Sequence, residues 1–598
     1  MTETTSQGIP APEGDAAVID TEYEIGQDNI ERKIGPFGFD IHNPVFLVSG
    51  LSIIAFVIYA LAFPGQAEGV FADIFSFVTK GFDWFFLGSA NIFVLFCIAL
   101  IVLPVGKVRL GGAEATPDYT YTGWFAMLFA AGMGIGLMFY GVSEPLTHYS
   151  TAAGGTTYSV SFTGEDPGEG AFPEGFGSRE EFDAATGLTA PDRAALDAAI
   201  ASSVPEAARD AFIASETRTD WSPLGASSDD EQEAVRLGMA ATIFHWGLHP
   251  WAIYAVVALA LALFSYNKGL PLSIRSAFYP ILGERVWGWW GHVIDILAVF
   301  ATLFGLATSL GLGATQASAG LNELFGIPMG RTTEVVLICA ITAVALVSVL
   351  RGLDGGVKKL SEINMGLALL LLLFVLIAGP TLALLTGFAD SLIAYGQYLP
   401  ALSNPVGRED VNFTQGWTSF YWAWWISWSP FVGMFIARVS RGRTVREFVT
   451  CVLLIPSLVC VFWMTVFGGT AIDQVLNEGY TAAQDAPLEL QLFKMLDGLP
   501  LAAITSFIGI VLVIVFFVTS SDSGSLVIDT ITAGGKIDAP VPQRVFWCIF
   551  EGLVAVVLLV GGGLGALQAM VISTGLPFTL VLLVMCFAIW RGLRAEPR

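Results

Sequence analysis

The sequence predicts an all-α integral membrane protein with twelve transmembrane helices, and three observations support this prediction. Of the 598 residues, 54% are hydrophobic and only 13% are charged, a balance far from that of a soluble globular chain. Apolar runs long enough to cross about 30 Å of hydrocarbon recur along the chain. Lysines and arginines, finally, concentrate in the loops on one side of these runs.

The predicted spans are the apolar runs at residues 44–63, 82–104, 120–141, 238–265, 288–319, 333–350, 364–387, 413–437, 448–470, 501–530, 545–563 and 568–590. The residues before 44 are polar and acidic and hold no apolar run ahead of a cleavage site, so we expect no signal peptide. The six cysteines lie mostly inside apolar runs without ligand spacing, which predicts neither a disulfide framework nor a metal site.

Positive charges indicate the orientation of these spans. If the N-terminus lies in the cytoplasm, the inward-facing segments hold most of the 28 lysines and arginines, as the positive-inside rule requires. An even number of spans then returns the C-terminus to the same side. We therefore expect a multi-pass protein of the cell inner (plasma) membrane with both termini in the cytoplasm.

Much of the net charge of −24 comes from a long acidic segment at 150–235, which the predicted orientation places outside the cell. The segment is rich in Gly, Ala, Asp, Glu and Ser and poor in large apolar residues, which predicts a solvated and partly disordered insert. Short surface helices are expected at 178–186, 190–201 and 205–215. The alternative is an extracellular sensor, and nothing catalytic occurs in the segment.

Four of the sixteen tryptophans lie within seven residues, in the sequence YWAWWISWSP that starts at Tyr421. At about 100° per residue, Tyr421, Trp424, Trp425 and Trp428 share one helical face. Phe435 lies further along the same face. Aromatic rings present a negative π-face, and several together can hold a quaternary ammonium that has no N–H to donate. The stripe therefore predicts a binding site for a methylated ammonium compound.

Three glycines at alternate positions interrupt the third predicted span: Gly132, Gly134 and Gly136. Each disfavours a helix by about 1 kcal/mol relative to alanine, and in lipid an unwound backbone survives only beside a cavity. Secondary transporters hold substrate and coupling ion at discontinuous helices of this kind. The alternative is close packing of helices through small residues.

The tenth predicted span carries hydroxyl groups at Thr519, Ser520, Ser521 and Ser523, next to Asp522. Hydroxyl and carbonyl oxygens are hard ligands that suit Na⁺. Two alternatives remain open at this stretch. The hydroxyls can bond back to their own helix, and Asp522 can mark the cytoplasmic end of the hydrophobic stretch.

The fourth predicted span contains the sequence HWGLHPWAIY, in which Trp251 and Tyr254 share a helical face and Pro250 predicts a kink. These aromatic residues either line a site or form an interfacial belt. His245 and His249 stand one turn apart, but the sequence places no third ligand and no glutamate near them. We therefore expect no transition-metal site.

Together these segments resemble the betaine/carnitine/choline transporter family over nearly all of residues 40–590. The motifs that carry the resemblance are AAGMGIGLMFYGVSEP at 130–145, HWGLHPWAIYA at 245–255, ATLFGLATSLGLG at 301–313, RGLDGGVKKLS at 351–361 and YWAWWISWSPFVGMFIARVSRGRTVREF at 421–448. The resemblance implies two extra N-terminal helices and then two five-helix inverted repeats of the LeuT type (spans 3–7 and 8–12). It also implies a homotrimer and transport by alternating access.

The resemblance also divides the chain into segments. They are a cytoplasmic acidic N-terminal tail (1–43), two N-terminal transmembrane helices (44–104), a first inverted repeat that contains the acidic insert (105–387), an extracellular connecting segment (388–411), a second inverted repeat (412–590) and a short cytoplasmic C-terminal tail (591–598).

Roles for individual residues follow from the same resemblance. The aromatic box around the trimethylammonium group would consist of Trp246, Trp251, Tyr254 and Trp425. Trp424 and Trp428 would flank the permeation path. The unwound backbone at Gly132–Gly136 would receive the carboxylate end of the substrate.

The resemblance further implies where sodium binds in Na⁺-coupled members. One sodium site would consist of Ala130, Met133, Phe516, Thr519 and Ser520. A second site would use two threonines one turn apart in the fifth span. Here Thr302 is present, but Leu306 stands in place of its partner. One or two Na⁺ per cycle therefore both remain open.

The glycine stretch bears on the charge of the substrate. A buried cation such as choline needs an anionic partner, and the resemblance suggests that proton-coupled choline members place an acid in this stretch. Gly134, Ile135 and Gly136 provide none. We therefore expect a methylated-ammonium zwitterion: glycine betaine or a close analogue such as dimethylsulfoniopropionate or ectoine.

The predicted function is Na⁺-coupled symport of this osmolyte, with the lipid bilayer as the surroundings. We expect no cofactor besides the coupling ion, no nucleic-acid partner and no enzymatic activity, since no catalytic constellation occurs at membrane depth. An H⁺-coupled choline symporter and a carnitine-type antiporter of the same family are alternatives. From another class, a membrane osmolyte sensor also remains open.

Overall fold

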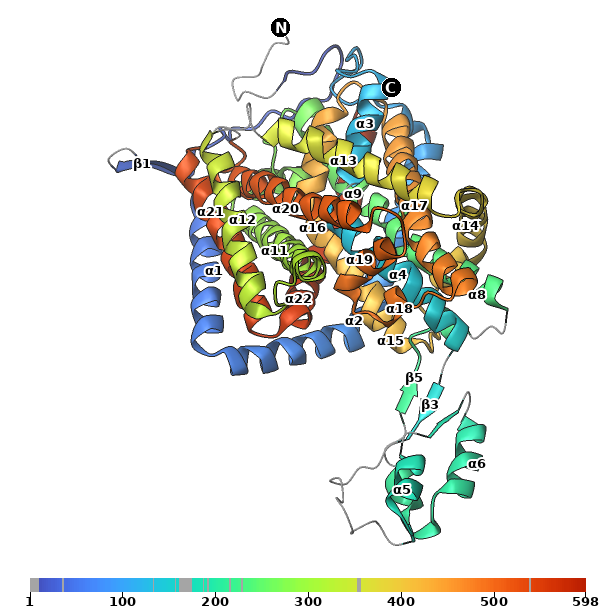
Figure 1. Ribbon diagram of the computed structural model, residues 1–598. Helices are drawn as coiled ribbons and strands as arrows, with labels where there is room; N and C mark the ends of the chain where they lie inside the picture. The colour runs from blue at the N-terminus through green and yellow to red at the C-terminus, as the bar shows by residue number, and fades with distance from the viewer. Residues whose placement is uncertain are drawn as a thin grey trace.

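The computed structural model is a bundle of long helices from which a small lobe projects (Figure 1). It describes residues 10–34, 37–132, 134–155, 157–160, 175–186, 188–190, 193–213, 217–226, 230–351, 357–536 and 539–597. The strand β1 (Asn29–Ile34) and the C-terminal end of α22 (Gly563–Arg594) lie at one end of the bundle, and the lobe lies at the opposite end. The chain thus enters and leaves the bundle at the same end, as an even number of spans requires.

Within the described ranges, ten helices are long and apolar enough to cross a membrane. The number is eleven if the bent pair α3 (Tyr121–Gly132) and α4 (Ile135–Gly154) forms one span. The protein is therefore an all-α, multi-pass membrane protein. The difference from the twelve predicted spans lies in α16 (Ser419–Val439). Its tryptophan, tyrosine and serine residues lower its mean hydropathy, although most of its side chains are buried in the bundle.

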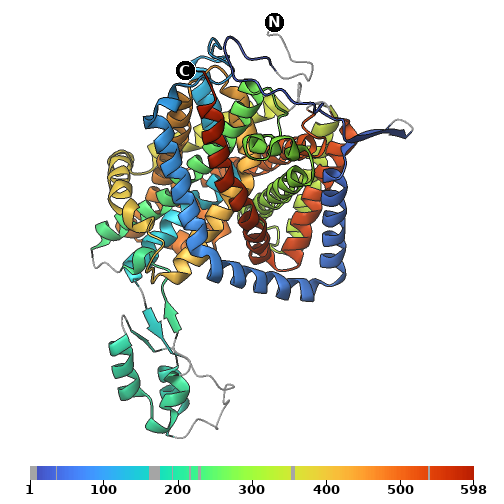
Figure 2. The same cartoon turned by 180° about the vertical axis from the view of Figure 1, so that it is seen from behind.

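Ten further helices form most of the rest of the bundle. They are α1 (Val45–Ala62), α2 (Pro64–Val102), α8 (Glu231–Trp246), α9 (Leu248–Ala262), α11 (Trp289–Phe325), α12 (Arg331–Arg351), α13 (Val357–Ala378), α17 (Val445–Asp473), α20 (Ala502–Thr532) and α21 (Val541–Val560). Helix α2 differs from the others in its course: its first part lies across the end of the bundle that carries the lobe (Figure 2).

Two spans are broken along their length. The glycine stretch separates α3 from α4 with a bend of 68°, and Met133 between them lies outside the described residues. The second break falls at Gly247, which separates α8 from α9 and has non-helical backbone angles. In lipid such breaks require nearby polar partners or a cavity. Both breaks lie deep in the bundle, where α4 packs against α8 and α9 packs against α16.

Several elements lie where the sequence predicts no secondary structure, among them a long helix and a strand hairpin. Helix α14 (Thr381–Leu402) begins inside the predicted seventh span and fills much of the segment at 388–411. The N-terminal segment contains an antiparallel hairpin of β1 and β2 (Phe37–His42). Polar residues in both regions hide their structure, because neither segment shows a long apolar run.

The acidic insert folds around a core of its own. Its elements are α5 (Arg179–Ala185), α6 (Arg193–Ser203), α7 (Arg209–Ile213), β3 (Thr157–Ser159), β4 (Thr189–Ala190) and β5 (Thr217–Thr219). Helices α5 and α7 fall within the predicted segments 178–186 and 205–215, and α6 overlaps the predicted segment 190–201 but ends two residues later. The strands form an antiparallel sheet in the order β4-β3-β5, and β3 with β5 forms the neck of the lobe (Figure 1). Phe182, Leu196 and Phe212 belong to a cluster of buried apolar side chains that the composition does not predict.

Candidate functional site

A cavity of about 520 Å³ lies where the two broken spans meet α16. Its lining residues are Ala131, Gly134, Ile135, Gly136, Leu137, Trp246, Pro250, Trp251, Tyr254, Ser309, Trp424, Trp425, Trp428, Val432 and Cys460. The structure thus brings together the residues predicted to bind substrate from three separate segments of the sequence. Gly132 ends α3, and its surroundings lie outside what the structure describes.

Four aromatic rings in succession form one wall of the cavity. Trp246 packs edge-on against Trp425, with ring centroids 4.9 Å apart. Trp425 packs in the same way against Tyr254 at 6.0 Å, and Tyr254 against Trp251 at 5.3 Å. Because neighbouring rings are nearly perpendicular, they present π-faces in different directions, as a cage for a quaternary ammonium requires.

The indole N–H groups of these tryptophans are bonded to other helices. Trp425 donates to the carbonyl of His245 at 2.9 Å, and Trp428 donates to the carbonyl of Gly305 at 2.9 Å. Each bond fixes the rotation of a ring about its side chain and leaves only the π-system to the cavity. The wall is therefore a preorganised aromatic surface with few donors of its own.

The aromatic face predicted on α16 divides into parts with different surroundings. Trp424, Trp425 and Trp428 line the cavity. Tyr421 is completely buried and does not line it. Phe435, further along the same face, is 38% exposed and is not part of the described cavity lining. After Trp428 the cavity is lined instead by Val432, one turn further along α16.

The N-terminus of α4 forms another wall of the cavity. Residues 134–137 line it, and the N-cap Gly134 has no side chain to cap the helix. The first N–H groups of a helix have no intrahelical acceptor, and the helix dipole favours an anion beside them. A Cβ at Gly136 would lie 2.9 Å from the rings of both Trp246 and Trp424, whereas one at Gly134 would meet nothing within 4 Å.

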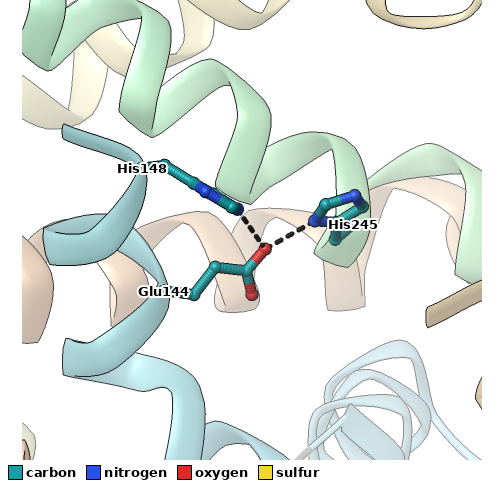
Figure 3. A group of neighbouring side chains, drawn as sticks. All are labelled: Glu144, His148 and His245. Carbon is teal, nitrogen blue, oxygen red and sulfur yellow. Dashed lines mark hydrogen bonds and ion pairs between the residues drawn. The ribbon is translucent and has the colours of Figure 1, made fainter. Parts of the chain in front are cut away.

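A buried carboxylate lies directly behind the aromatic wall. Glu144 Oε1 is 3.2 Å from His148 Nε2 and 2.6 Å from His245 Nδ1 (Figure 3). Its other oxygen, Oε2, accepts from Trp246 Nε1 at 2.6 Å and from the Tyr421 hydroxyl at 2.5 Å. Glu144 and both histidines are completely buried. One carboxylate therefore joins α4, α8 and α16 at the edge of the cavity.

The sequence analysis missed this group. The expectation that no glutamate accompanies His245 is wrong, since Glu144 lies beside it, and these two residues with His148 place three potential metal-ligating atoms within 4.8 Å of one another. His249 takes no part, because its Nε2 lies 3.0 Å from Asn91 Oδ1. The available signal was an acidic residue in a membrane segment, which is by default a functional candidate. Glu144 stands just past the end of the predicted span at 120–141, where an acidic residue is ordinary and does not indicate a site.

The residues on α20 that were predicted to bind sodium show no such convergence. The Thr519 hydroxyl donates to the carbonyls of Val515 and Phe516, both in its own helix. None of the described side-chain hydrogen bonds links Ala130 to Thr519 or Ser520. The cavity lining contains no residue of α20. The alternative of hydroxyl bonds within the helix thus describes Thr519.

In the fifth span, the threonine of the second predicted sodium site also bonds within its own helix. Thr302 donates its hydroxyl to the carbonyl of Ala298 at 2.7 Å, one turn back in α11. The side chain of Leu306 packs closely on α20, because a Cβ at Gly524 would lie 2.3 Å from it. Met133, the remaining predicted ligand, lies outside the described residues.

Comparison with known proteins identifies the family of the chain. A sequence model of the betaine/carnitine/choline family of transporters matches residues 44–161 and 215–598, which include every lining residue. The chain belongs to this family. It is thus a transporter of the betaine/choline type and not an enzyme. Residues 1–43 and 162–214 of the transporter lie outside the match, and the described part of the second range belongs to the projecting lobe.

Three relatives of the transporter are similar over nearly their whole length. A glycine betaine/proline/choline transporter of Vibrio parahaemolyticus is 59% identical over 598 residues, 100% of this chain and 98% of the relative. Glycine betaine transporter 1 of the same organism is 50% identical over 97% of this chain and 98% of the relative. The glycine betaine transporter OpuD of Bacillus subtilis is 39% identical over 91% and 93% respectively.

Proposed function

We propose that the transporter takes up a methylated-ammonium zwitterion, glycine betaine or a close analogue such as dimethylsulfoniopropionate or ectoine, by Na⁺-coupled symport. The observation that carries the proposal is the polarity of the cavity. An aromatic wall of Trp246, Trp251, Tyr254 and Trp425 suits a trimethylammonium group. The N-terminus of α4, with unpaired N–H groups and a positive dipole end, suits a carboxylate.

The two ends of the cavity and the relatives favour the same class of substrate. The three relatives described above all include glycine betaine in their names. A zwitterion would satisfy both ends of the cavity at once, whereas an apolar solute would leave the N–H groups of α4 without a partner.

Sodium coupling is the part of the proposal that rests on the α3 and α20 residues. The proposed site comprises Ala130, Met133, Phe516, Thr519 and Ser520. Oxygen ligands of this kind suit Na⁺, and the interrupted backbone next to Ala130 frees carbonyl groups. We propose one such site per transporter, because Leu306 occupies the position where a second threonine would be needed beside Thr302.

We further propose that the transporter works by alternating access of two inverted repeats of the LeuT type, and that it forms a homotrimer in the cell inner membrane. Helix α11 packs against α20, the third helices of the two proposed repeats. The excess of lysine and arginine in the inward-facing loops supports cytoplasmic termini.

Uptake by the purified full-length protein in proteoliposomes tests the function. Labelled glycine betaine is offered under an imposed Na⁺, H⁺ or K⁺ gradient, one gradient at a time. We expect accumulation that requires an inward Na⁺ gradient and is unchanged by a pH gradient alone. Accumulation driven by the pH gradient would overturn the sodium assignment. Binding of betaine without any accumulation would favour an osmolyte sensor instead.

A further inference from the structure

The buried carboxylate Glu144 accepts four hydrogen bonds, which is the full capacity of its two oxygens. The four donors are His148 Nε2, His245 Nδ1, Trp246 Nε1 and the Tyr421 hydroxyl. In the tautomers in which His148 carries its proton on Nε2 and His245 on Nδ1, all four partners donate, and a protonated carboxyl group would have one proton too many for this arrangement. Four donors that all point at the oxygens are the surroundings in which an ionised carboxylate is stable without water.

Each of the four donors can be electrically neutral. Trp246 and Tyr421 are neutral in any case. His245 donates from Nδ1 when its Nε2 accepts from the Thr418 hydroxyl, 3.0 Å away. The Nδ1 atom of His148 has no hydrogen-bond partner among the described residues, as expected for a neutral imidazole that donates only from Nε2. Within the described part of the chain, no lysine or arginine forms an ion pair with Glu144, and its two histidine contacts are ion pairs only if an imidazole is protonated. The group as a whole then carries one negative charge.

That charge lies directly behind the surface that meets the substrate. Trp246 forms part of the aromatic wall, and its indole N–H points at Glu144. Tyr421, the second donor to the same oxygen, lies 5.7 Å from the Trp246 ring and 5.9 Å from the Trp425 ring, centroid to centroid. A hydrogen bond to an anion polarises the donor, and such polarisation is strong in a low-dielectric interior. The rings therefore present a more negative face to the cavity.

We propose that Glu144 is an ionised residue that sets the specificity of the cavity for a cationic headgroup, by its charge and by fixing Trp246 and Tyr421. The inference rests on the proposed betaine-type function and names what selects the ammonium group. It also supplies the anionic partner that is missing from the glycine stretch. A permanent cation without a carboxylate, such as choline, then has a counter-charge in this cavity, and we expect it to bind.

The decisive experiment compares a charged headgroup with an uncharged one of the same shape. In 3,3-dimethylbutanoate, a carbon atom replaces the nitrogen of glycine betaine. Dissociation constants for both compounds are measured by competition with labelled betaine on the purified full-length protein at saturating Na⁺. The variants are Glu144→Gln and, as a matched control, Glu551→Gln. Glu551 is also completely buried but accepts from Ser521 on α20, away from the cavity.

We expect Glu144→Gln to weaken the binding of betaine by roughly tenfold, less than the loss of a whole cation–π contact in a desolvated site. The uncharged analogue should change by less than about threefold, so that the preference for the charged compound falls. Glu551→Gln should leave that preference unchanged. Equal losses for both compounds would overturn the proposal in favour of a purely structural role. A wild-type protein that fails to bind betaine would instead overturn the proposed function.

Two further measurements keep the proposal testable if Glu144→Gln does not fold. Tyr421→Phe removes one donor and leaves the charge, so it should retain the preference for betaine over the analogue. Choline should compete with labelled betaine on the wild-type protein. Loss of betaine binding with a chelator, and its recovery with Zn²⁺, would overturn the proposal, because the three side chains would then hold a metal ion instead of forming these hydrogen bonds.

Discussion

The aromatic wall of the cavity and the hydroxyl stretch of α20 are built in opposite ways. In the wall, polar atoms of the rings bond to other helices: Trp425 to the carbonyl of His245, and Trp246 to Glu144. In α20, the hydroxyl of Thr519 bonds back to carbonyls of its own helix. The first arrangement ties three helices to one another. The second ties the Thr519 hydroxyl only to its own helix.

The difference affects how strongly each site should respond to a substitution. Rings that are already fixed lose little freedom when a substrate arrives, so binding energy goes into the contact itself. The Thr519 hydroxyl, which donates within its own helix, keeps lone pairs that can coordinate an ion, but it is only one of the five proposed sodium ligands. We therefore expect substitutions in the aromatic wall to lower the affinity for the substrate strongly. Substitutions at α20 should have smaller effects, which appear only in the Na⁺ dependence of uptake.

The largest effect is expected from Trp425→Ala. The ring of Trp425 contacts both Trp246 and Tyr254, so its loss opens the centre of the wall. A desolvated cation–π contact contributes about 2 kcal/mol, which corresponds to a loss of betaine affinity of about thirtyfold. Equilibrium binding of labelled betaine at saturating Na⁺ measures this loss of affinity.

Trp84→Ala is the control for that measurement, since Trp84 is 57% exposed on α2, away from the cavity. It should bind betaine with unchanged affinity. Equal affinity in Trp425→Ala and wild type would contradict the assignment of the substrate to this cavity.

A smaller effect is expected from Gly136→Ala, and almost none from Gly134→Ala. A methyl group at Gly136 would overlap the rings of Trp246 and Trp424 at 2.9 Å, whereas at Gly134 it meets open space. Overpacking of a rigid site costs about 1–3 kcal/mol, so the affinity for betaine should fall by about tenfold in the first variant. The initial rate of uptake at low betaine concentration compares the pair. A greater loss in Gly134→Ala would mean that the wall is less rigid than its hydrogen bonds indicate.

The sodium residues should respond more weakly still. In Thr519→Ala, the Na⁺ concentration for half-maximal uptake should rise by about fivefold, the equivalent of one net hydrogen bond. The affinity for betaine at saturating Na⁺ should stay the same. Thr302→Ala serves as the control, because the hydroxyl of Thr302 donates to the carbonyl of Ala298 and Thr302 is not part of the one sodium site that we propose. An unchanged sodium requirement in Thr519→Ala would remove α20 from the proposed site.

The same contrast explains which parts of the molecule the sequence could predict. Apolar runs and alternate glycines act locally, so the spans and the break between α3 and α4 could be predicted from the sequence. The tryptophans were identified as binding residues because cation recognition needs a concentration of aromatic rings in one segment. Such features need no knowledge of distant contacts.

Glu144 could not be recognised in that way. Its role depends on partners 101, 102 and 277 positions away in the chain, and on its own the residue reads as the polar end of a span. The sequence argument that no acid faces the substrate is correct for the glycine stretch and incomplete for the cavity. Helix α14 and the core of the lobe were missed for a related reason, because short or polar elements owe their structure to tertiary packing.

The smallest effect on transport is expected from removing the lobe. Its neck pairs Thr157 with Thr219 and Ser159 with Thr217, so residues 160–216 can be replaced by an Asn-Gly hairpin turn that joins the two strands. The lobe has its own buried cluster and contributes no residue to the cavity lining. Betaine uptake should therefore remain within about twofold of wild type, since surface loops tolerate such changes. Loss of uptake in a correctly folded variant would show that the lobe acts on the cavity, the one result here that would favour a sensing role for it.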